Sequence, residues 1–162
     1  MSDKNKVSTT ADESVDYQAK DREAVFEVHN RYMVANTEVD TAKLAEVWDA
    51  TPTNVYFNLT GHNYRGLEHW SKLWHYYQPR LNMLMPWISW DHNIWVEGDV
   101  AWLTCLRLSQ AQWVGEGSRG PVDQSLPTVS RATEIYKRVD GEWKAVHVHY
   151  SPAALSPRPG NV

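Results

Sequence analysis

The second half of the chain consists of long runs that favour β-strands, and these runs constrain the fold more than any other feature. Two short turn sequences, Glu97-Gly98-Asp99 and Asp140-Gly141, separate some of them, and a loop over 115–127 rich in glycine, proline and serine separates the others. Runs that are joined by such turns pair as antiparallel hairpins. The predicted strands are Trp87 to Val96, Val100 to Trp113, Val129 to Val139 and Glu142 to Ser151.

The first half of the chain shows helical periodicity instead. Apolar residues recur with a spacing of three or four from Asp21 onward, which predicts a long amphipathic helix. Asp40 is a good N-cap for a second, short helix, and a third helix is predicted to present Leu67, Trp70, Trp74 and Tyr77 on one face. Helices followed by hairpins predict one α+β domain over 21–153, with a disordered tail over 1–20 and an extended tail over 154–162.

Charge and hydropathy exclude several classes of protein. The 162 residues carry a formal charge of -4 and no basic run, so no nucleic-acid partner is expected. The polar N-terminus lacks the apolar segment of a signal peptide, and no run approaches the 18 apolar residues of a membrane span, so a cytoplasmic protein without a membrane partner is expected. Cys105 is the only cysteine and is expected to be a buried thiol.

The aromatic composition is unusual. Nine Trp and eight Tyr stand against only two Phe. Trp and Tyr bring a polar group that needs a partner when it is buried. The composition is compatible with a Trp-rich core and oligomer interface, and also with an aromatic wall around a ligand. In the second case the expected substrate-binding residues are Tyr32, Trp48, Trp70, Trp74 and Trp90.

Four stretches resemble the nuclear-transport-factor-2-like (NTF2-like) superfamily in its SnoaL-like branch. They are YRGLEHW from Tyr64, CLRLSQ from Cys105, RATEIYKRVDG from Arg131 and EWKAVHVHYS from Glu142, and the resemblance covers residues 22–153. The same superfamily contains ketosteroid isomerase, scytalone dehydratase and the association domain of calmodulin-dependent protein kinase II. The resemblance implies a cone: a curved antiparallel sheet wrapped around three helices, with a pocket at its open end.

The resemblance also implies a candidate catalytic set. In the kinase association domain, the positions that match Arg107 and Tyr150 face the cavity and bind small carboxylates. Here Tyr150 stands in place of one arginine, and Glu134 aligns with another. A mixed set of Arg107, Glu134 and Tyr150 is suited to proton transfer. The alternative is a buried Arg107–Glu134 salt bridge beside a core tyrosine.

Two other groups of residues are candidates. Asp91 and His92 are adjacent in a predicted strand, so only one of them can face the cavity. We favour His92, as a group that exchanges protons near neutral pH. The alternative is that His92 lies at the rim of the cavity without a catalytic role. His147 and His149 lie two apart and share a face, as metal ligands would. Metal-free relatives share this strand pattern, however, so both are expected to be structural, and no metal is expected.

The resulting expectation is a cofactor-free enzyme. No glycine-rich phosphate loop and no G-x-S-x-G motif is present. We therefore expect a lyase, dehydratase or isomerase that works by proton transfer on a bulky aromatic molecule; some relatives cleave lignin-derived diaryl compounds and release formaldehyde. The alternative is a non-catalytic ligand-binding or oligomerisation domain. A homo-oligomer, a dimer or a trimer, is expected in either case.

Overall fold

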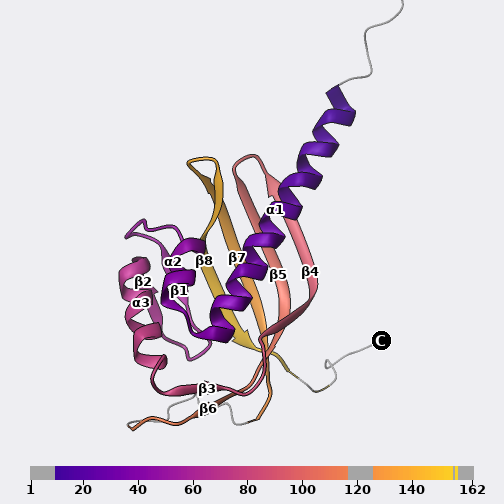
Figure 1. Cartoon of the computed structure of the whole chain (residues 1–162). Helices are drawn as coiled ribbons and strands as arrows, with labels where there is room; N and C mark the ends of the chain where they lie inside the picture. Colours follow the sequence, from indigo (N-terminus) through magenta and orange to yellow (C-terminus); the bar gives the residue numbers. More distant parts are fainter. Residues whose placement is uncertain (1–9, 117–125, 155, 157–162) are drawn as a thin grey trace, which may run out of the picture.

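The structure is a computed structural model that describes residues 10–116, 126–154 and 156. Two helices come first, two short strands precede the third helix, and the other strands follow; the helices pack on one face of the sheet (Figure 1). The helices are α1 (Thr10–Glu38), α2 (Thr41–Val47) and α3 (Gly66–Tyr77). The strands are β1 (Val55–Phe57), β2 (Asn63–Arg65), β3 (Leu81–Met83), β4 (Ile88–Glu97), β5 (Val100–Ser109), β6 (Ala111–Trp113), β7 (Thr128–Val139) and β8 (Glu142–Pro152). This confirms the predicted α+β fold.

Helix α1 has the predicted buried face but an earlier start. All five apolar residues that predicted the helix, from Val25 to Val39, are buried. The helix nevertheless begins at Thr10, so the predicted disordered tail over 1–20 is wrong for residues 10–20. The N-terminal turns extend past the end of the sheet (Figure 1), and Tyr17 is 68% exposed. Residues 10–20 show no apolar periodicity in the sequence, which is why the pattern missed this part of the helix. Residues 1–9 and most of the predicted C-terminal tail lie outside the described residues.

The main sheet is mixed rather than wholly antiparallel. Its six strands follow the order β2-β1-β8-β7-β5-β4, and β3 pairs with β6 in a separate two-stranded sheet. Strand β1 runs parallel to β8, with Val55 opposite His147. No hairpin joins these two strands, so no turn sequence fixes their relative direction, and the prediction of a purely antiparallel sheet is wrong at this one pairing.

Two irregularities change which side chains face the helices. The β4–β5 register shifts between Trp90 and Asn93, and Asp91 there has a φ of 56°. The β7–β8 register shifts beside Ile135 and Tyr136. Each shift reverses the simple alternation of inward and outward side chains along its strand.

Helices α2 and α3 follow the sequence pattern closely. The Asp40 carboxylate accepts hydrogen bonds from the backbone N–H groups of Ala42 and Lys43, as an N-cap does. On α3, Trp70, Trp74 and Tyr77 are buried, and Leu67 is half-buried. These residues and α1 cover the concave side of the sheet, which is where the core lies.

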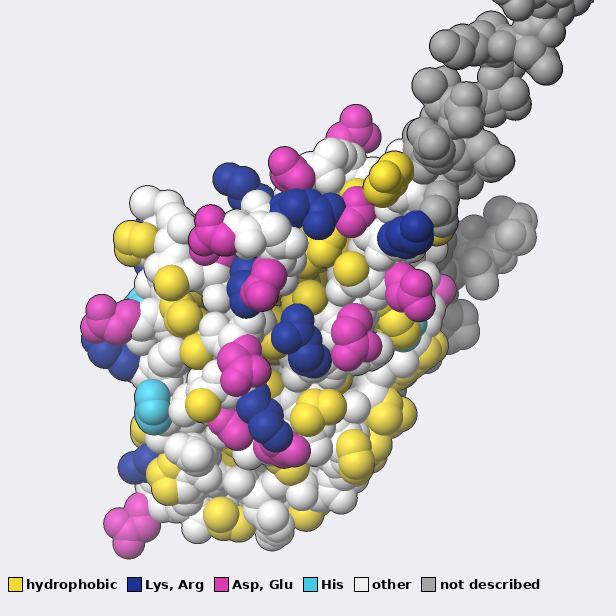
Figure 2. Space-filling view, turned by 45° about the horizontal axis from the view of Figure 1, so that its top comes forward, with side chains coloured by type: hydrophobic (Ala, Val, Ile, Leu, Met, Phe, Trp, Pro, Cys, Tyr) yellow, Lys and Arg dark blue, Asp and Glu magenta, His cyan; other side chains and the backbone are white. Residues whose placement is uncertain are grey.

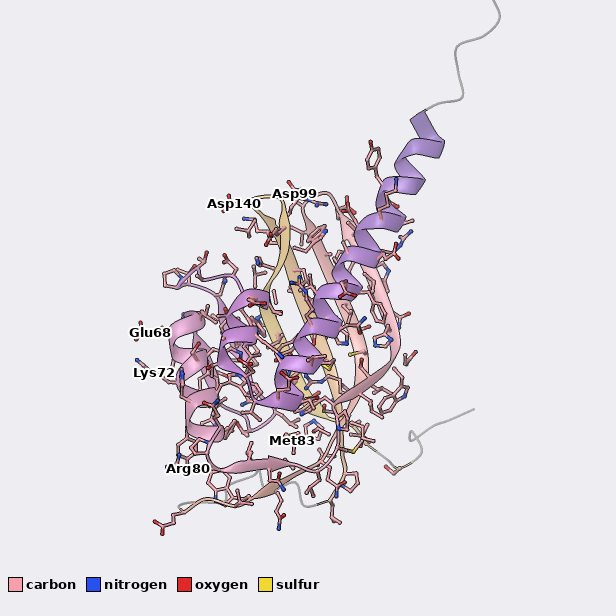
Figure 3. The ribbon with its side chains drawn as sticks, viewed as in Figure 1. Glu68, Lys72, Arg80, Met83, Asp99 and Asp140 are labelled. Atoms are coloured by element: carbon pink, nitrogen blue, oxygen red, sulfur yellow. The ribbon has the colours of Figure 1, made fainter. Side chains whose placement is uncertain are left out.

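The two ends of the sheet differ. The hairpin turns that contain Asp99 and Asp140 lie at one end, and Met83 in β3 lies at the other (Figure 3). Over the face seen in Figure 2, acidic and basic side chains are interspersed without a large basic patch. Among the described residues, no helix is long and apolar enough to cross a membrane.

Candidate active site

A cavity lies between the helices and the sheet, at the end where β3 closes the molecule. Its walls include Tyr32 from α1, Trp70 and Trp74 from α3, and Arg107 and Tyr150 from β5 and β8. Leu81, Met83 and Trp87 border it from the chain that leads into β4. The cavity volume is about 60 Å³, which is room for roughly two water molecules.

The cavity brings together five of the residues predicted from the sequence. Tyr32, Trp70, Trp74, Arg107 and Tyr150 all line it. They come from two helices and two strands, so only the folded chain assembles them.

The other predicted site residues lie elsewhere. Trp48 is buried behind the wall, with its ring 5.2 Å from that of Tyr32 and 5.9 Å from that of Trp70. Glu134 is fully buried and lies behind Tyr150 rather than in the wall. Trp90 is 39% exposed on the outer face of β4, so its prediction as a substrate contact is wrong. The alternation that places Ser89 inward places Trp90 outward.

Arg107 is a buried cation with few partners. Its guanidinium carbon lies 3.5 Å from the centre of the Tyr150 ring and 4.9 Å from that of Trp87. Nη2 lies 3.4 Å from the Ser130 hydroxyl, whereas Nε and Nη1 have no hydrogen-bond partner among the described residues. A buried guanidinium with unpaired N–H groups is costly unless a ligand or water satisfies it.

The indole groups of the wall add further free donors. Trp70, Trp74 and Trp87 each have a buried N–H group with no hydrogen-bond partner in the described part of the chain. An indole N–H and a guanidinium can donate hydrogen bonds but cannot accept them. The unpaired polar groups around the cavity therefore favour a ligand that carries acceptor oxygen atoms.

A hydrogen-bonded network lies behind the cavity wall and centres on Glu134. The Tyr150 hydroxyl lies 2.9 Å from the Tyr32 hydroxyl and 3.4 Å from Glu134 Oε1. The other carboxylate oxygen, Oε2, lies 2.5 Å from the Tyr136 hydroxyl and 2.7 Å from His29 Nδ1. Tyr150 is thus placed between the Glu134 carboxylate and the cavity.

The expected alternative for these residues, an Arg107–Glu134 salt bridge, does not form directly. The Glu134 carboxylate instead accepts a hydrogen bond from His29 Nδ1, at 2.7 Å. Arg107 does not pair with Glu134, but its positive charge helps to lower the pKa of the Glu134 carboxyl.

Burial and neighbouring charges set the protonation of this network. Burial raises the pKa of the Glu134 carboxyl, but His29, Arg107 and the Tyr136 hydrogen bond outweigh it and leave this pKa below its usual value. Burial raises the pKa of Tyr32 to about 12 and raises the pKa of Tyr150 well above 10. Burial also raises the pKa of Tyr136 well above 10, so at neutral pH the network contains a carboxylate and three neutral phenols.

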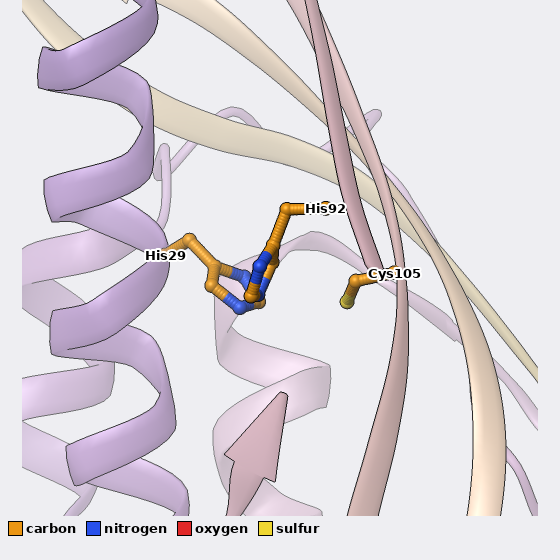
Figure 4. Close-up of side chains that lie close together, drawn as sticks. All are labelled: His29, His92 and Cys105. Atoms are coloured by element: carbon orange, nitrogen blue, oxygen red, sulfur yellow. The ribbon is translucent and has the colours of Figure 1, made fainter. Parts of the chain in front are cut away.

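His92 faces inward but does not reach the cavity. The register shift in β4 turns it toward α1, where its Nε2 lies 2.9 Å from the Ser89 hydroxyl. Burial lowers the pKa of His92, and His29 adds to that effect. Within the described part of the chain, one group of side chains has the spacing of metal ligands, namely His29, His92 and Cys105 (Figure 4).

His147 and His149 lie on the outer side of β8. His147 Nδ1 donates a hydrogen bond to the Val55 carbonyl in β1, at 2.7 Å. Each of the two imidazoles packs edge-on against Phe57, with ring centres 5.3 and 5.4 Å apart. Their contacts hold β1 against β8, which supports the structural role expected for them.

Sequence reasoning missed His29 and Tyr136 in this network, and also Ser89, whose hydroxyl lies 2.9 Å from His29 Nε2. A signal existed for His29, because it lies four residues after Val25 and three before Tyr32, on the buried face of α1. Tyr136 lies two residues after Glu134 and shares its face. The register shift hides Ser89, since the position of a bulge cannot be read from strand alternation.

The comparison with protein families matches a SnoaL-like domain over residues 25–155. No curated protein sequence matches the chain.

Several solved structures share the fold at low sequence identity. A proposed dehydratase of the NTF2-like family from Streptomyces avermitilis is 17% identical, with 84% of this chain and 98% of that chain covered and a TM-score of 0.66. A proposed ketosteroid isomerase from Parabacteroides distasonis is 18% identical, with 83% and 89% covered and a TM-score of 0.58. A proposed calcium/calmodulin-dependent kinase II association domain from Exiguobacterium sibiricum is 11% identical, with 94% and 100% covered and a TM-score of 0.64. These likenesses confirm the NTF2-like fold.

Proposed function

We propose, from the premise that the chain belongs to the SnoaL-like domain family, that it is a cofactor-independent isomerase, dehydratase or lyase. Its substrate is an aromatic small molecule that carries acceptor oxygens, and the reaction proceeds by proton transfer. The observation that carries the proposal is the unpaired, buried Arg107 guanidinium beside the Tyr150–Glu134 pair.

Arg107 and the indole N–H groups bind the substrate oxygen. A carboxylate, carbonyl or phenolate oxygen accepts hydrogen bonds from Arg107 Nε and Nη1, which have no other partner among the described residues. As negative charge develops on that oxygen in the transition state, the buried cation stabilises it more than it stabilises the ground state. The aromatic part of the substrate packs against Trp70 and Trp74.

Glu134 is the base and acts through Tyr150. The Tyr150 oxygen takes a proton from the substrate while the Tyr150 hydroxyl proton passes to Glu134 Oε1. The separation of 3.4 Å is long for a hydrogen bond, and such contacts tighten when a substrate binds. Glu134 is the anionic member and Tyr150 the neutral member of this relay, in agreement with the lowered and raised pKa values of the two groups.

The cavity limits how much of a substrate is enclosed. A volume of about 60 Å³ is small beside the roughly 300–1,000 Å³ of ordinary ligand pockets. A single polar group fits beside Arg107, but a diaryl compound such as the lignin-derived ones enters only if Leu81, Met83 and Trp87 move aside. Cleavage of a diaryl compound with release of formaldehyde is the most specific form of the proposal, and it requires this movement.

A panel of aromatic acids, aldehydes and phenols tests the proposal, with each acid paired to its methyl ester. The protein is incubated with each compound in D₂O, and mass spectrometry follows loss of water, loss of formaldehyde or uptake of deuterium. We expect conversion of at least one compound, with the acid favoured over its ester. A protein that binds members of the panel and converts none of them is not this enzyme.

The second candidate function is a ligand-binding or assembly domain. It is supported by the exposed aromatic residues on the outer face of the sheet, Trp95 and Trp102, which are 44% and 37% exposed. The likeness to a proposed association domain points the same way. Saturable binding of an aromatic acid without turnover would favour this function.

A further inference from the structure

Three side chains with metal-binding atoms meet behind Glu134, away from the cavity. They are His29 from α1, His92 from β4 and Cys105 from β5 (Figure 4), and their ligand atoms all lie within 4.8 Å of one another. None of the three lines the cavity. We propose that they form a binding site for a transition-metal ion of the zinc class.

The backbone directs these side chains toward one point. Cys105 is buried on the inner face of β5, in the alternation that also turns Leu103 and Arg107 inward. His92 reaches the same space only because the register shift in β4, with Asp91 at a φ of 56°, turns it inward after Ser89. A left-handed conformation at a residue other than glycine is uncommon and is found where a local geometry has to be held.

The hydrogen bonds around His29 are those of a metal ligand. Its Nδ1–H donates to Glu134 Oε2 at 2.7 Å, because the carboxylate can only accept. That bond fixes the ring and leaves Nε2 as the nitrogen that can bind a metal, the arrangement found in carboxylate–histidine–metal sites. The buried Glu134 charge also offsets part of the charge of a cation at His29.

The Ser89 hydroxyl links the two histidines. Its oxygen lies 2.9 Å from His29 Nε2 and 2.9 Å from His92 Nε2. Both ring nitrogens are therefore already turned toward one point. Rotation of the serine side chain frees both nitrogens, and a water is then available as a fourth ligand.

Two imidazoles and one thiolate select the kind of ion. Zn²⁺ binds such nitrogen and sulfur ligands in tetrahedral sites, whereas Mg²⁺ and Ca²⁺ require oxygen ligands. Bonds of about 2.0–2.3 Å need ligand atoms roughly 3.5 Å apart, and the three ligand atoms already lie within 4.8 Å of one another, so small movements of the side chains complete the site. The Cys105 sulfur loses its proton as the metal–sulfur bond forms, so each bound ion releases one proton to the buffer.

Cobalt is a suitable probe because tetrahedral Co²⁺ replaces Zn²⁺ and is coloured. Reduced, full-length protein is titrated with Co²⁺ while a pH indicator measures proton release. We expect one equivalent to give visible bands of tetrahedral cobalt and a near-ultraviolet band from sulfur to cobalt. One equivalent of Zn²⁺ should then remove both signals.

Three variants assign the ligands. Cys105→Ser should lose the sulfur band, and His92→Ala should lose the one-equivalent binding, whereas His149→Ala is an exposed control that should bind as the wild type does. Far-ultraviolet circular dichroism verifies that each variant is folded. Wild-type protein without tetrahedral cobalt bands, or a sulfur band that persists in folded Cys105→Ser, would overturn the proposal. Neither result decides the proposed function, because turnover of the aromatic panel is measured without added metal.

Discussion

Arg107 is the residue whose surroundings most need a ligand. It is 1% exposed, it lies against two aromatic rings, and no carboxylate of the described residues pairs with it directly. A charged hydrogen bond to a buried partner contributes about 1.5–3 kcal/mol. The residue is therefore placed to bind an anionic oxygen rather than to hold the core together.

Removal of Arg107 should weaken the binding of an aromatic carboxylate. We expect Arg107→Ala to raise the Kd by at least about 10-fold. A loss of about 1.4 kcal/mol of binding free energy corresponds to a tenfold change in Kd, and the charged hydrogen bond contributes at least that much. Turnover should fall as well, because the lost cation acts on the transition state too. Arg131→Ala removes an exposed arginine from the outer face of β7 and serves as the control. Calorimetry that gives the same Kd for wild type and Arg107→Ala would rule out this role.

Tyr32 should make the protein sensitive to alkali. Burial raises its pKa to about 12, from 10.0. Because the folded state holds this proton more tightly than the unfolded state does, the stabilisation is complete below pH 10 and is lost as the pH rises from about 10 to about 12. The free energy of unfolding should fall by up to about 1.4 kcal/mol per pH unit from this group.

Urea unfolding at a series of pH values measures this effect. Other buried tyrosines, among them Tyr56 with a pKa of about 12, add to the slope. The comparison is therefore made with Tyr32→Phe, which should show a shallower loss of stability above pH 10. Equal slopes for the two proteins would mean that Tyr32 ionises as readily in the folded protein as in the unfolded chain.

At the scale of single elements, strand β4 determines what surrounds Glu134. Its register shift turns both Ser89 and His92 toward α1. The two residues are three apart, so in a regular strand they would point to opposite faces. The left-handed Asp91 lies in this shift. Asp is one of the few residues other than glycine that adopt this conformation readily.

Substitution at Asp91 tests whether the bulge is under conformational constraint. Asp91→Val should lower the free energy of unfolding by about 1–3 kcal/mol, because a β-branched residue is strained at positive φ. Asp91→Gly should change it by less than about 1 kcal/mol. Glu97→Val, an exposed substitution at the end of the same strand, should stay within about 0.5 kcal/mol. Urea denaturation that finds Asp91→Val as stable as wild type would contradict the constraint.

These elements also show what the sequence could and could not predict. The apolar spacing of α1, the Asp40 cap and the turns at Asp99 and Asp140 have local causes, so the three helices and the two hairpins were predicted. The earlier start of α1 was not predicted, nor was the division of the predicted strand Val100 to Trp113 into β5 and β6, which lie in different sheets. The family resemblance placed Glu134 beside Tyr150, and the two lie 3.4 Å apart, but Glu134 lies behind the cavity wall rather than in it. His92 and Trp90 were assigned to the cavity wrongly, because a bulge and the distance of β4 from the cavity depend on tertiary packing that no short window of sequence contains.

At the scale of the whole molecule, the outer face of strands β4 and β5 exposes large apolar side chains. The Trp95 and Trp102 rings stack there with centres 5.7 Å apart, and Ile88, Trp90 and Val100 are also exposed. Contiguous exposed apolar surface on a folded protein marks a site of association. This supports the predicted homo-oligomer, with β4 and β5 at the interface.

Light scattering at micromolar concentration measures the assembly. We expect a mass of at least two chains for the wild type, and a mass nearer one chain for Trp102→Glu, because a buried charge at the interface opposes association. Lys72→Glu changes an exposed residue of α3, away from the outer face of the sheet, and is the control. A monomeric wild type would show that this face is not used for self-association.

The central claim is that Glu134 is the base that acts through Tyr150 while Arg107 holds the substrate, and Glu134→Gln separates these two roles. Glutamine keeps the shape and the hydrogen bond from His29 but removes the basic oxygen. We expect kcat on the compound identified in the aromatic panel to fall by at least about 100-fold, while the Kd measured by calorimetry changes by less than about threefold. Glu142→Gln, at an exposed position on β8, should leave both quantities unchanged. A folded Glu134→Gln protein that retains the wild-type kcat would contradict the account.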